Sequence, residues 1–277
     1  MYSMRSGQPE LATRGLYPND QREALSPSAS FEIHQRARIR LPSSLCKPSL
    51  RTYFDWEDSW NDDYAKRPAL LDLFAGGGGA AMGYYLAGFR VVGVDLKPQK
   101  HYPFEFHLAD ALTYPLEGYD AYHASPPCQG ESNMTPVRYR SRTPTATMIQ
   151  AIRVRLIETG KPFIIENVTG ARKHLVTPVK LCGSQFGLPI FYHRYFECHG
   201  FYCLSRSCHH NYKPIVASGG PNANGWGKPR PHASVATRRE ALRNDWMTGE
   251  ELNESIPWQY AEFIGKYLME AVKRGKA

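Results

Sequence analysis

Short apolar runs alternate with longer amphipathic stretches through the middle of the chain. Each run stops at or close to Gly, Asp, Pro or Asn, which is typical of strands buried on both faces of a sheet. Four runs of this kind lie at 69–74, 90–95, 119–124 and 162–167. Helices are expected at 79–88 and 144–158. Strands that alternate with helices predict an α/β fold with a right-handed, doubly wound, mostly parallel sheet.

The regions before and after this part of the chain differ from it in composition and in hydrophobic pattern. Residues 1–66 lack a sustained hydrophobic period, and we interpret them as an irregular basic N-terminal extension rather than a domain. The main α/β domain is then expected at 67–196. Residues 197–255 are poor in aliphatic side chains and predict a small, loop-rich insert. The final stretch, 256–277, predicts a helix that packs back on the sheet.

Two patterns near the C-terminus support that helix. Thr248 and Glu251 have the spacing of a capping box, which marks a helix start. Beyond it, apolar side chains recur on one helical face. These are Tyr260, Phe263, Ile264, Tyr267, Leu268 and Val272.

Charge and cysteine content narrow the function classes. The chain carries 34 Lys and Arg against 26 Asp and Glu, a formal charge of +8, which suits a polyanionic partner such as DNA or RNA. Six cysteines without a signal-peptide pattern argue against a disulfide scaffold and predict a reducing, cytoplasmic location. No apolar run reaches about 18 residues, so we expect no membrane partner. We also expect a monomer.

A glycine-rich turn follows the first predicted strand in "LLDLFAGGGGAAMGYYLAGF". Backbone amides and the positive end of the next helix would face an anionic or carboxylate group there. Asp95 ends the next strand about 20 residues after Gly76, the spacing at which a carboxylate binds ribose hydroxyls. We expect packing alone not to require four glycines, which favours a ligand. By itself the pattern also fits a nicotinamide site, and Asp110 fits either an adenine contact or a helix cap.

The stretch "ASPPCQGES" places Cys128 after two prolines at the end of a predicted strand. A buried cysteine in isolation is more often an inert small residue than a nucleophile. Glu166 ends another apolar strand, where an unpaired carboxylate is costly, so it is either bound to a ligand or paired structurally. These residues alone leave both alternatives open.

The segments "DLFAGGGG", "SPPCQ" and "ENV", in that order, resemble the cytosine-C5 methyltransferase family, notably its compact phage and bacterial forms. The resemblance runs from about residue 69 to 272 and does not include the N-terminal extension. It implies a Rossmann-like S-adenosylmethionine-binding catalytic domain at 67–196, a target-recognition insert at 197–255 and a closing C-terminal helix. The implied activity is DNA (cytosine-5-)-methylation in a bacterial or phage-infected cell, as in restriction-modification systems.

The resemblance also implies roles for individual residues. Cys128 would be the nucleophile, Glu166 would bind N3 and the amino group of a flipped-out cytosine, and Arg194 would hold O2. S-adenosylmethionine would contact Phe74, Gly76, Gly78, Gly79, Asp95, Leu96, Asp110 and Pro127. Double-stranded DNA would contact Gln129, Arg138, Arg140, Arg142, Lys228 and Arg230.

Three positions depart from the family pattern. Of the usual Gln-x-Arg-x-Arg only the final arginine is present, as Arg194. The ribose-binding acid is Asp95 rather than Glu. Where the closing helix usually carries Gly-Asn beside the cofactor, we find Gly265-Lys266. Lys266 would either turn to solvent or pair with an extra carboxylate on a carboxylated S-adenosylmethionine.

The insert also contains "CHGFYCLSRSCHH". Cys198, Cys203, Cys208 and His209 or His210 have the chemistry of tetrahedral zinc ligands. Their spacing is not the tight Cys-x-x-Cys pair, so free thiols and exposed histidines are the alternative. Zinc is therefore possible but is not predicted.

Three other functions remain open. The same chemistry on RNA is the nearest, because one branch of the family acts on tRNA. A catalytically silent nucleic-acid-binding protein is the second, although it has no need of Cys128, Glu166 and Asp95 together. A nicotinamide oxidoreductase is the third, and it leaves Cys128 and Glu166 without roles.

Overall fold

The computed structural model describes residues 62–128, 145–205, 207–217 and 233–275. Its strands are β1 Ala69–Leu73, β2 Arg90–Asp95, β3 Glu105–Leu108, β4 Ala121–Ala124, β5 Phe163–Asn167, β6 Val179–Leu181 and β7 Arg194–His199. Its α-helices are α3 Asp62–Ala65, α4 Gly79–Leu86, α5 Thr145–Glu158, α6 Val235–Leu242, α7 Glu251–Glu254 and α8 Trp258–Arg274. Two 3-10 helices, η3 Thr169–His174 and η4 Gly183–Phe186, flank β6.

The strands form one seven-stranded sheet in the order β3-β2-β1-β4-β5-β7-β6. The pairs among β1 to β5 are parallel, whereas β7 runs antiparallel to both β5 and β6. The prediction of a doubly wound, mostly parallel α/β sheet is confirmed. The sequence pattern did not predict β3, β6 or β7. Strand β3 is half-exposed and β6 has three residues, so neither carries a buried apolar run.

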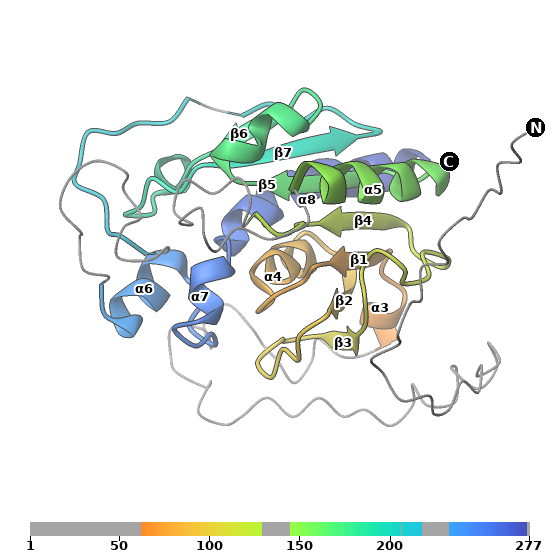
Figure 1. Cartoon of the computed structure of the whole chain (residues 1–277), viewed down its shortest axis with the longest axis horizontal. Helices are drawn as coiled ribbons and strands as arrows, with labels where there is room; N and C mark the ends of the chain where they lie inside the picture. The colour runs from red at the N-terminus through yellow and green to blue at the C-terminus, as the bar shows by residue number, and fades with distance from the viewer. Residues whose placement is uncertain (1–61, 129–144, 206, 218–232, 276–277) are drawn as a thin grey trace, which may run out of the picture. The chain divides into compact units, whose positions relative to one another are not determined.

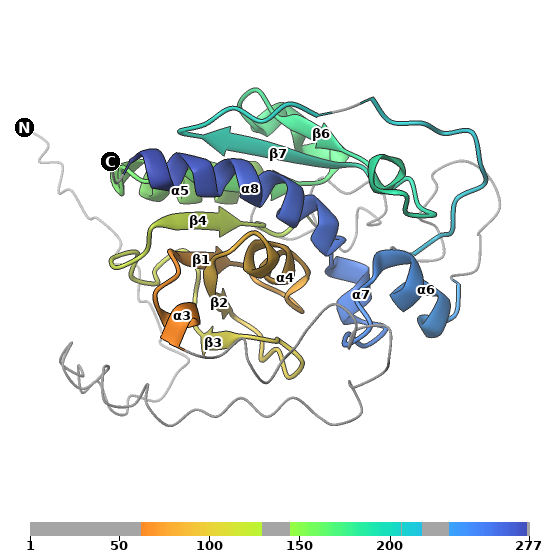
Figure 2. The same cartoon turned by 180° about the vertical axis from the view of Figure 1, so that it is seen from behind.

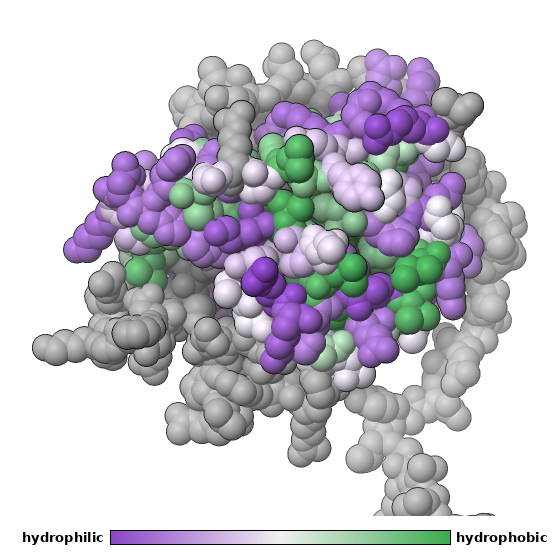
Figure 3. All heavy atoms as spheres, turned by 90° about the horizontal axis from the view of Figure 1, so that it is seen from above, coloured by the Kyte–Doolittle hydropathy of each residue, from purple (hydrophilic) through white to green (hydrophobic). Residues whose placement is uncertain are grey.

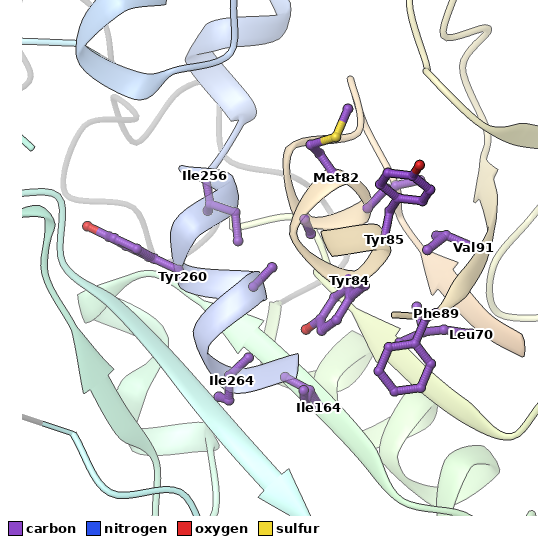
Figure 4. Packing of buried hydrophobic residues seen from close by; sticks show 14 of the residues in the cluster. Leu70, Met82, Tyr84, Tyr85, Phe89, Val91, Ile164, Ile256, Tyr260 and Ile264 are labelled. Atoms are coloured by element: carbon purple, nitrogen blue, oxygen red, sulfur yellow. The ribbon is translucent and has the colours of Figure 1, made fainter. Parts of the chain in front are cut away.

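Alternating side chains place a hydrophobic core on each face of the sheet. Leu70, Val91 and Ile164 point toward α4 and α8, and Figure 4 shows Tyr84 and Ile264 packed with them. Leu71 and its neighbours on the other face join the buried side of α5. Accordingly, α5 lies in front of the sheet in Figure 1 and α8 lies in front of it in Figure 2. The sheet therefore lies between two layers of packed helices, which fix the positions of the carboxyl ends of its parallel strands.

The C-terminal helix packs against the sheet as predicted. Tyr260, Ile264, Leu268 and Val272 are buried in α8, whereas Tyr267 remains at the surface. The capping-box pair is also present: the Thr248 N–H donates to Glu251 at 2.6 Å, and the Glu251 N–H donates to the Thr248 hydroxyl at 3.3 Å. This box starts α7 rather than α8, which begins only at Trp258.

The end of the expected irregular extension is ordered against the sheet, which corrects that expectation for Asp62–Ala65. Tyr64 in α3 is buried, and its hydroxyl accepts a hydrogen bond from the Val91 N–H at 3.2 Å. The Tyr64 ring packs against Tyr85 and Arg67. Tyr85 is distant in the sequence, so the residues around Tyr64 do not predict this packing. Residues 1–61 lie outside the described part of the chain.

The expected insert begins inside the sheet, because β7 continues to His199, past position 196. Farther along, the insert forms α6 and α7, two short helices that Figure 1 places beside the carboxyl end of the sheet. The face drawn in Figure 3 is mostly hydrophilic, with several separate hydrophobic patches on the described surface. Among the described residues, no helix combines the length and apolar character needed to cross a bilayer.

Candidate active site

The segment that leaves β4 is anchored through its carbonyl groups. Buried Asn167, at the end of β5, donates from Nδ2 to the Pro126 carbonyl at 2.9 Å. Buried Thr145, at the start of α5, donates from Oγ1 to the Pro127 carbonyl at 3.0 Å. Proline fixes its own φ, so two prolines with anchored carbonyls leave this loop few conformations. Cys128 is thereby held at the carboxyl edge of the sheet. Sequence reasoning missed Thr145, which no local motif marks.

Glu166 lies beside this loop in β5 and is only 6% exposed. The Nε of Arg194, which starts β7, is 3.0 Å from Glu166 Oε1. This oxygen accepts no hydrogen bond of favourable geometry. The contact between Arg194 and Glu166 is therefore an ion pair without a hydrogen bond. Burial raises the pKa of Glu166, while Arg194 and the Ser125 hydroxyl act to lower it. The carboxyl group therefore holds a proton more readily than an exposed glutamate does.

Arg194 has a second partner in Tyr192, which is partly buried. Its guanidinium lies over the ring of Tyr192, 3.8 Å from the ring centroid, and also bonds the Tyr192 hydroxyl. Tyr260 of α8 donates to the Tyr192 carbonyl at 2.7 Å, which ties this loop to the closing helix. Burial acts to lower the pKa of Arg194, but Tyr192, Glu166 and Cys128 outweigh it, and the pKa is raised. Arg194 thus stays charged.

The Cys128 thiol lies within the electrostatic reach of both charged groups. Burial raises its pKa above the ordinary value; Arg194 opposes this, and Glu166 and Glu254 reinforce it. Glu254 of α7 acts on the thiol through its charge alone, a contributor that sequence reasoning missed. A cysteine with a raised pKa is predominantly the thiol at neutral pH. Any nucleophilic role therefore requires the proton to leave as sulfur reacts.

Two further polar side chains lie buried behind Glu166, and sequence reasoning missed both. Asp72 and His123 are paired neighbours in β1 and β4. Burial raises the pKa of Asp72 and lowers that of His123 to about 3, so their 4.0 Å approach is not an ion pair. Tyr102 donates to Asp72 at 3.3 Å, and His123 Nε2 is 2.8 Å from the Ser125 hydroxyl. Ser125 in turn bonds Glu166, which extends the polar contacts from the sheet interior to the site.

The glycine-rich turn lies at the neighbouring strand end. The Gly76 N–H donates to Asp95 Oδ2 at 3.0 Å, and the Lys97 N–H donates to Oδ1 at 2.9 Å. Asp95 thus links the glycine-rich turn to the end of β2, the strand end at which the sequence predicted it. Gly76 has a φ of +51°, and a Cβ atom there would meet nothing within 4 Å. This is the position in the turn where a ligand can contact the backbone directly.

Packing explains the glycine after the turn, which corrects our expectation that packing does not require these glycines. A Cβ atom at Gly79 would lie 2.3 Å from Ser255 Oγ and 2.4 Å from the Ile256 carbonyl oxygen. Gly77 meets Glu251, and its carbonyl accepts a hydrogen bond from Trp246 Nε1 at 2.9 Å. The segment that precedes α8 therefore packs directly against the turn. Trp246 gave no signal in the sequence.

The remaining cofactor candidates occupy the same strand edge. Leu96 follows β2 and is 67% exposed, which is unusual for a leucine beside a buried strand. Asp110 follows β3, and its Oδ1 accepts a hydrogen bond from the Leu112 N–H at 2.9 Å. That bond closes a local turn, because residues 111–113 form a turn and not the helix that a cap at Asp110 would start. Phe74 is in the left-handed region at φ 59° and begins the turn.

Lys266 lies away from the turn. Gly265 packs against Ala87, just past the C-terminal end of α4, whereas the turn adjoins the N-terminal end of that helix. The Lys266 side chain is 63% exposed, and its Nζ donates to Glu262 at 2.7 Å. Of the two alternatives for Lys266, the structure supports the one in which it turns to solvent.

Several basic candidates have other surroundings or cannot be placed. Gln129, Arg138, Arg140, Arg142, Lys228 and Arg230 lie outside the described residues. Arg238, which follows Lys228 and Arg230 in the sequence, is buried and donates to the carbonyls of Ala217 and Gly249. Arg239 donates to the Met247 carbonyl at 2.6 Å. Both arginines hold the insert together instead of facing a partner.

The zinc candidates are not grouped as the sequence suggested. Cys198 and Cys203 lie in the hydrophobic core, where burial raises the pKa of each thiol, that of Cys203 to about 12. His209 is exposed, and its backbone N–H bonds Ser184 at 3.0 Å. Cys208 instead approaches His193, which sequence reasoning did not consider.

Comparisons with known proteins give structural matches and no sequence-based family. No protein-family model matches the chain, and no curated protein matches it. One similar solved structure is described as a DNA modification methyltransferase encoded within an E. coli prophage, at 20% identity and a TM-score of 0.40, covering 55% of this chain and 53% of that one. The chain thus spans about half the length of that protein.

Two further similar structures are also described as methyltransferases. The S. pombe Dnmt2 methyltransferase is 13% identical, with a TM-score of 0.46, covering 74% of this chain and 99% of that one. The EhMeth methyltransferase of Entamoeba histolytica is 13% identical, with a TM-score of 0.48, covering 76% of this chain and 99% of that one. The resemblance of the chain to the cytosine-C5 methyltransferases depends instead on its sequence motifs around Gly76, Cys128 and Glu166.

Proposed function

We propose that the chain is an S-adenosylmethionine-dependent DNA cytosine-C5 methyltransferase that reacts through Cys128. The convergence of a thiol, a buried carboxyl group and a buried guanidinium at one strand edge carries this proposal. In open α/β sheets the carboxyl ends of the strands are where ligands bind.

The residues at the adjoining turn fit the proposed cofactor. Gly76 leaves open space at its α-carbon, and Asp95 lies at the end of β2, where ribose hydroxyls would meet a carboxylate. When bound, S-adenosylmethionine supplies a methyl group attached to a positively charged sulfur. We propose that it is held by Phe74, Gly76, Gly78, Gly79, Asp95, Leu96, Asp110 and Pro127.

Cys128 would activate the cytosine. Its sulfur forms a bond to C6 of the ring, and the displaced electron pair makes C5 nucleophilic. After C5 gains the methyl group, loss of the C5 proton and cleavage of the S–C6 bond restore the aromatic ring and the thiolate. Because C6 is inaccessible within a stacked duplex, the base must first turn out of the helix.

Glu166 and Arg194 would compensate the charge that develops during attack. The raised pKa of Glu166 suits a carboxylic acid that donates a proton toward N3 as sulfur adds to C6. Arg194 would donate to O2, and its positive charge also favours the Cys128 thiolate. Gln129, Arg138, Arg140, Arg142, Lys228 and Arg230 are proposed to contact the DNA.

The test is methyl transfer from labelled S-adenosylmethionine to duplex DNA, single-stranded DNA and tRNA in parallel. We expect transfer to duplex DNA, its loss in Cys128→Ser and its retention in the control Cys203→Ala. A duplex containing 5-fluorocytosine should become covalently attached to the wild type but not to Cys128→Ser. Transfer to tRNA alone would correct the substrate to RNA. Absence of transfer to all three would leave a nucleic-acid-binding protein.

A further inference from the structure

The segment after β7 and the loop before it carry a cluster of metal-binding side chains that the proposed reaction does not use. Its members are Cys182, His193, Cys208 and His210. One ligand atom from each lies within 4.8 Å of every other. We propose that these four residues bind a structural zinc ion.

The separations match the edges of a zinc tetrahedron. Zinc bonds of about 2.05 Å to nitrogen and about 2.3 Å to sulfur imply edges near 3.3 Å between two nitrogens and near 3.6 Å between nitrogen and sulfur. The Nε2 atoms of His193 and His210 are 3.3 Å apart. Cys182 Sγ is 3.3 Å from His210 Nε2, and Cys208 Sγ is 3.8 Å from His193 Nε2. One central ion satisfies all three separations.

Hydrogen bonding alone accounts for these contacts less well. His210 Nε2 lies 3.3 Å from both Cys182 Sγ and His193 Nε2. A ring nitrogen offers either one N–H or one lone pair, so it cannot form good hydrogen bonds with both neighbours at once. If the lone pair of His210 Nε2 instead binds a metal ion, the same ion can bind Cys182 and His193, and His210 needs no hydrogen bond to either.

The donor set selects the metal. Two thiolates with two imidazoles in a tetrahedral arrangement are typical of zinc. Four protein ligands leave no open position, which marks a structural rather than a catalytic site. None of the four is among the residues proposed for methyl transfer, and both cysteines are free thiols.

The surroundings show what the ion would stabilise. Residues 207–217 form neither helix nor strand. Isolated hydrogen bonds connect them to the main domain, including the one from the Ile215 N–H to the Pro189 carbonyl at 2.7 Å. Cys208 and His210 come from this segment, whereas Cys182 and His193 come from beside the sheet. A zinc ion would fasten the segment to the sheet edge, much as metals replace a core in small loop-rich units.

Metal analysis of the full chain, expressed without a histidine tag and kept reduced, tests the proposal. We expect about one zinc ion per chain in the wild type and in the control His209→Ala, whose side chain lies outside the cluster. Cys208→Ser and His210→Asn should each lose most of the metal. Equal loss in His209→Ala would overturn the assignment.

A titration of the metal-free wild type avoids dependence on variants that fail to fold. Added Co²⁺ should give the visible bands of a tetrahedral ion with thiolate ligands, and Zn²⁺ should remove them. A chelator should lower the melting temperature of the wild type but not of Cys208→Ser/His210→Asn. Absence of both bound metal and cobalt bands, or a Cys182–Cys208 disulfide in freshly isolated protein, would refute the site.

Discussion

Two glutamates lie in neighbouring strands of the sheet, and each faces an arginine, yet their surroundings differ. Glu197 in β7 is 3% exposed and receives hydrogen bonds from Arg153 at 2.8 and 2.7 Å. The Val176 N–H adds another at 2.8 Å. Glu166 in β5 is almost as buried, but its contact with Arg194 lacks hydrogen-bond alignment.

The difference separates an ion pair whose hydrogen bonds are complete from one whose carboxylate can still bond a ligand. The Arg153–Glu197 pair joins α5 to β7, and Arg153 also bonds the His174 carbonyl at 2.6 Å. A buried carboxylate such as Glu197, whose oxygens already accept several hydrogen bonds, needs no further partner. Glu166 keeps an oxygen without a directed bond and a raised pKa, so it remains able to bond a ligand. Burial alone does not distinguish the two, whereas hydrogen-bond satisfaction does.

The largest expected effect is on catalysis at Glu166. Glu166→Gln keeps the shape of the side chain but cannot transfer a proton, and we expect methyl transfer to fall about 100-fold or more. Its free energy of unfolding should stay within about 1 kcal/mol of the wild type, because the amide oxygen can still accept a bond from Ser125 and Arg194 keeps its contact with Tyr192. Initial rates and urea unfolding of the same preparations measure both quantities. A variant that loses stability but not activity would reverse the two roles.

Arg153→Met should act in the opposite way. It leaves Glu197 buried without its charged partner, and we expect a loss of about 3 kcal/mol in the free energy of unfolding. Arg153→Met/Glu197→Leu should recover most of that loss, because an apolar pair avoids the unpaired charge. Denaturant unfolding of both variants provides the measurement. No recovery in the double variant would mean that the salt bridge is not the stabilising element.

The Cys128 thiol allows a smaller test based on pH. Its alkylation rate should rise with pH and reach half of its maximum above the ordinary cysteine pKa, because burial raises the pKa. Arg194→Met removes a positive charge that stabilises the thiolate and should shift the profile to higher pH. Glu254→Gln removes a negative charge and should shift it to lower pH. Shifts in the same direction would contradict the assigned surroundings.

Strand ends could be predicted from the sequence because apolar runs and their stop residues are local signals. These local signals therefore predict Cys128, Glu166 and Asp95 at the carboxyl edge of the sheet. It did not reveal Trp246 or Thr145, which reach that edge from distant parts of the chain. Their roles arise from tertiary contacts that leave no periodic pattern.

The incorrect predictions have the same cause. The packing requirement at Gly79 was missed because its close contact with Ser255 lies far along the chain. The motif left two orientations open for Lys266, and the packing of α8 against α4, which the sequence does not reveal, turns it outward. Cys208 was grouped with cysteines near it in sequence, although its neighbours in space include His193. Spacing within one element was a better guide than spacing between elements.

The smallest expected effect concerns a third charged pair, Lys266 with Glu262, which extends the comparison to the surface. The lysine is 63% exposed, and solvent screens an exposed pair, so Lys266→Ala should change the free energy of unfolding by no more than about 0.5 kcal/mol. Its binding of S-adenosylmethionine should match the wild type, since Ser255 and Ile256 are the residues that adjoin the turn. Calorimetry and urea unfolding measure the two effects. A loss of cofactor affinity without a loss of stability would return Lys266 to the cofactor and contradict the placement of α8.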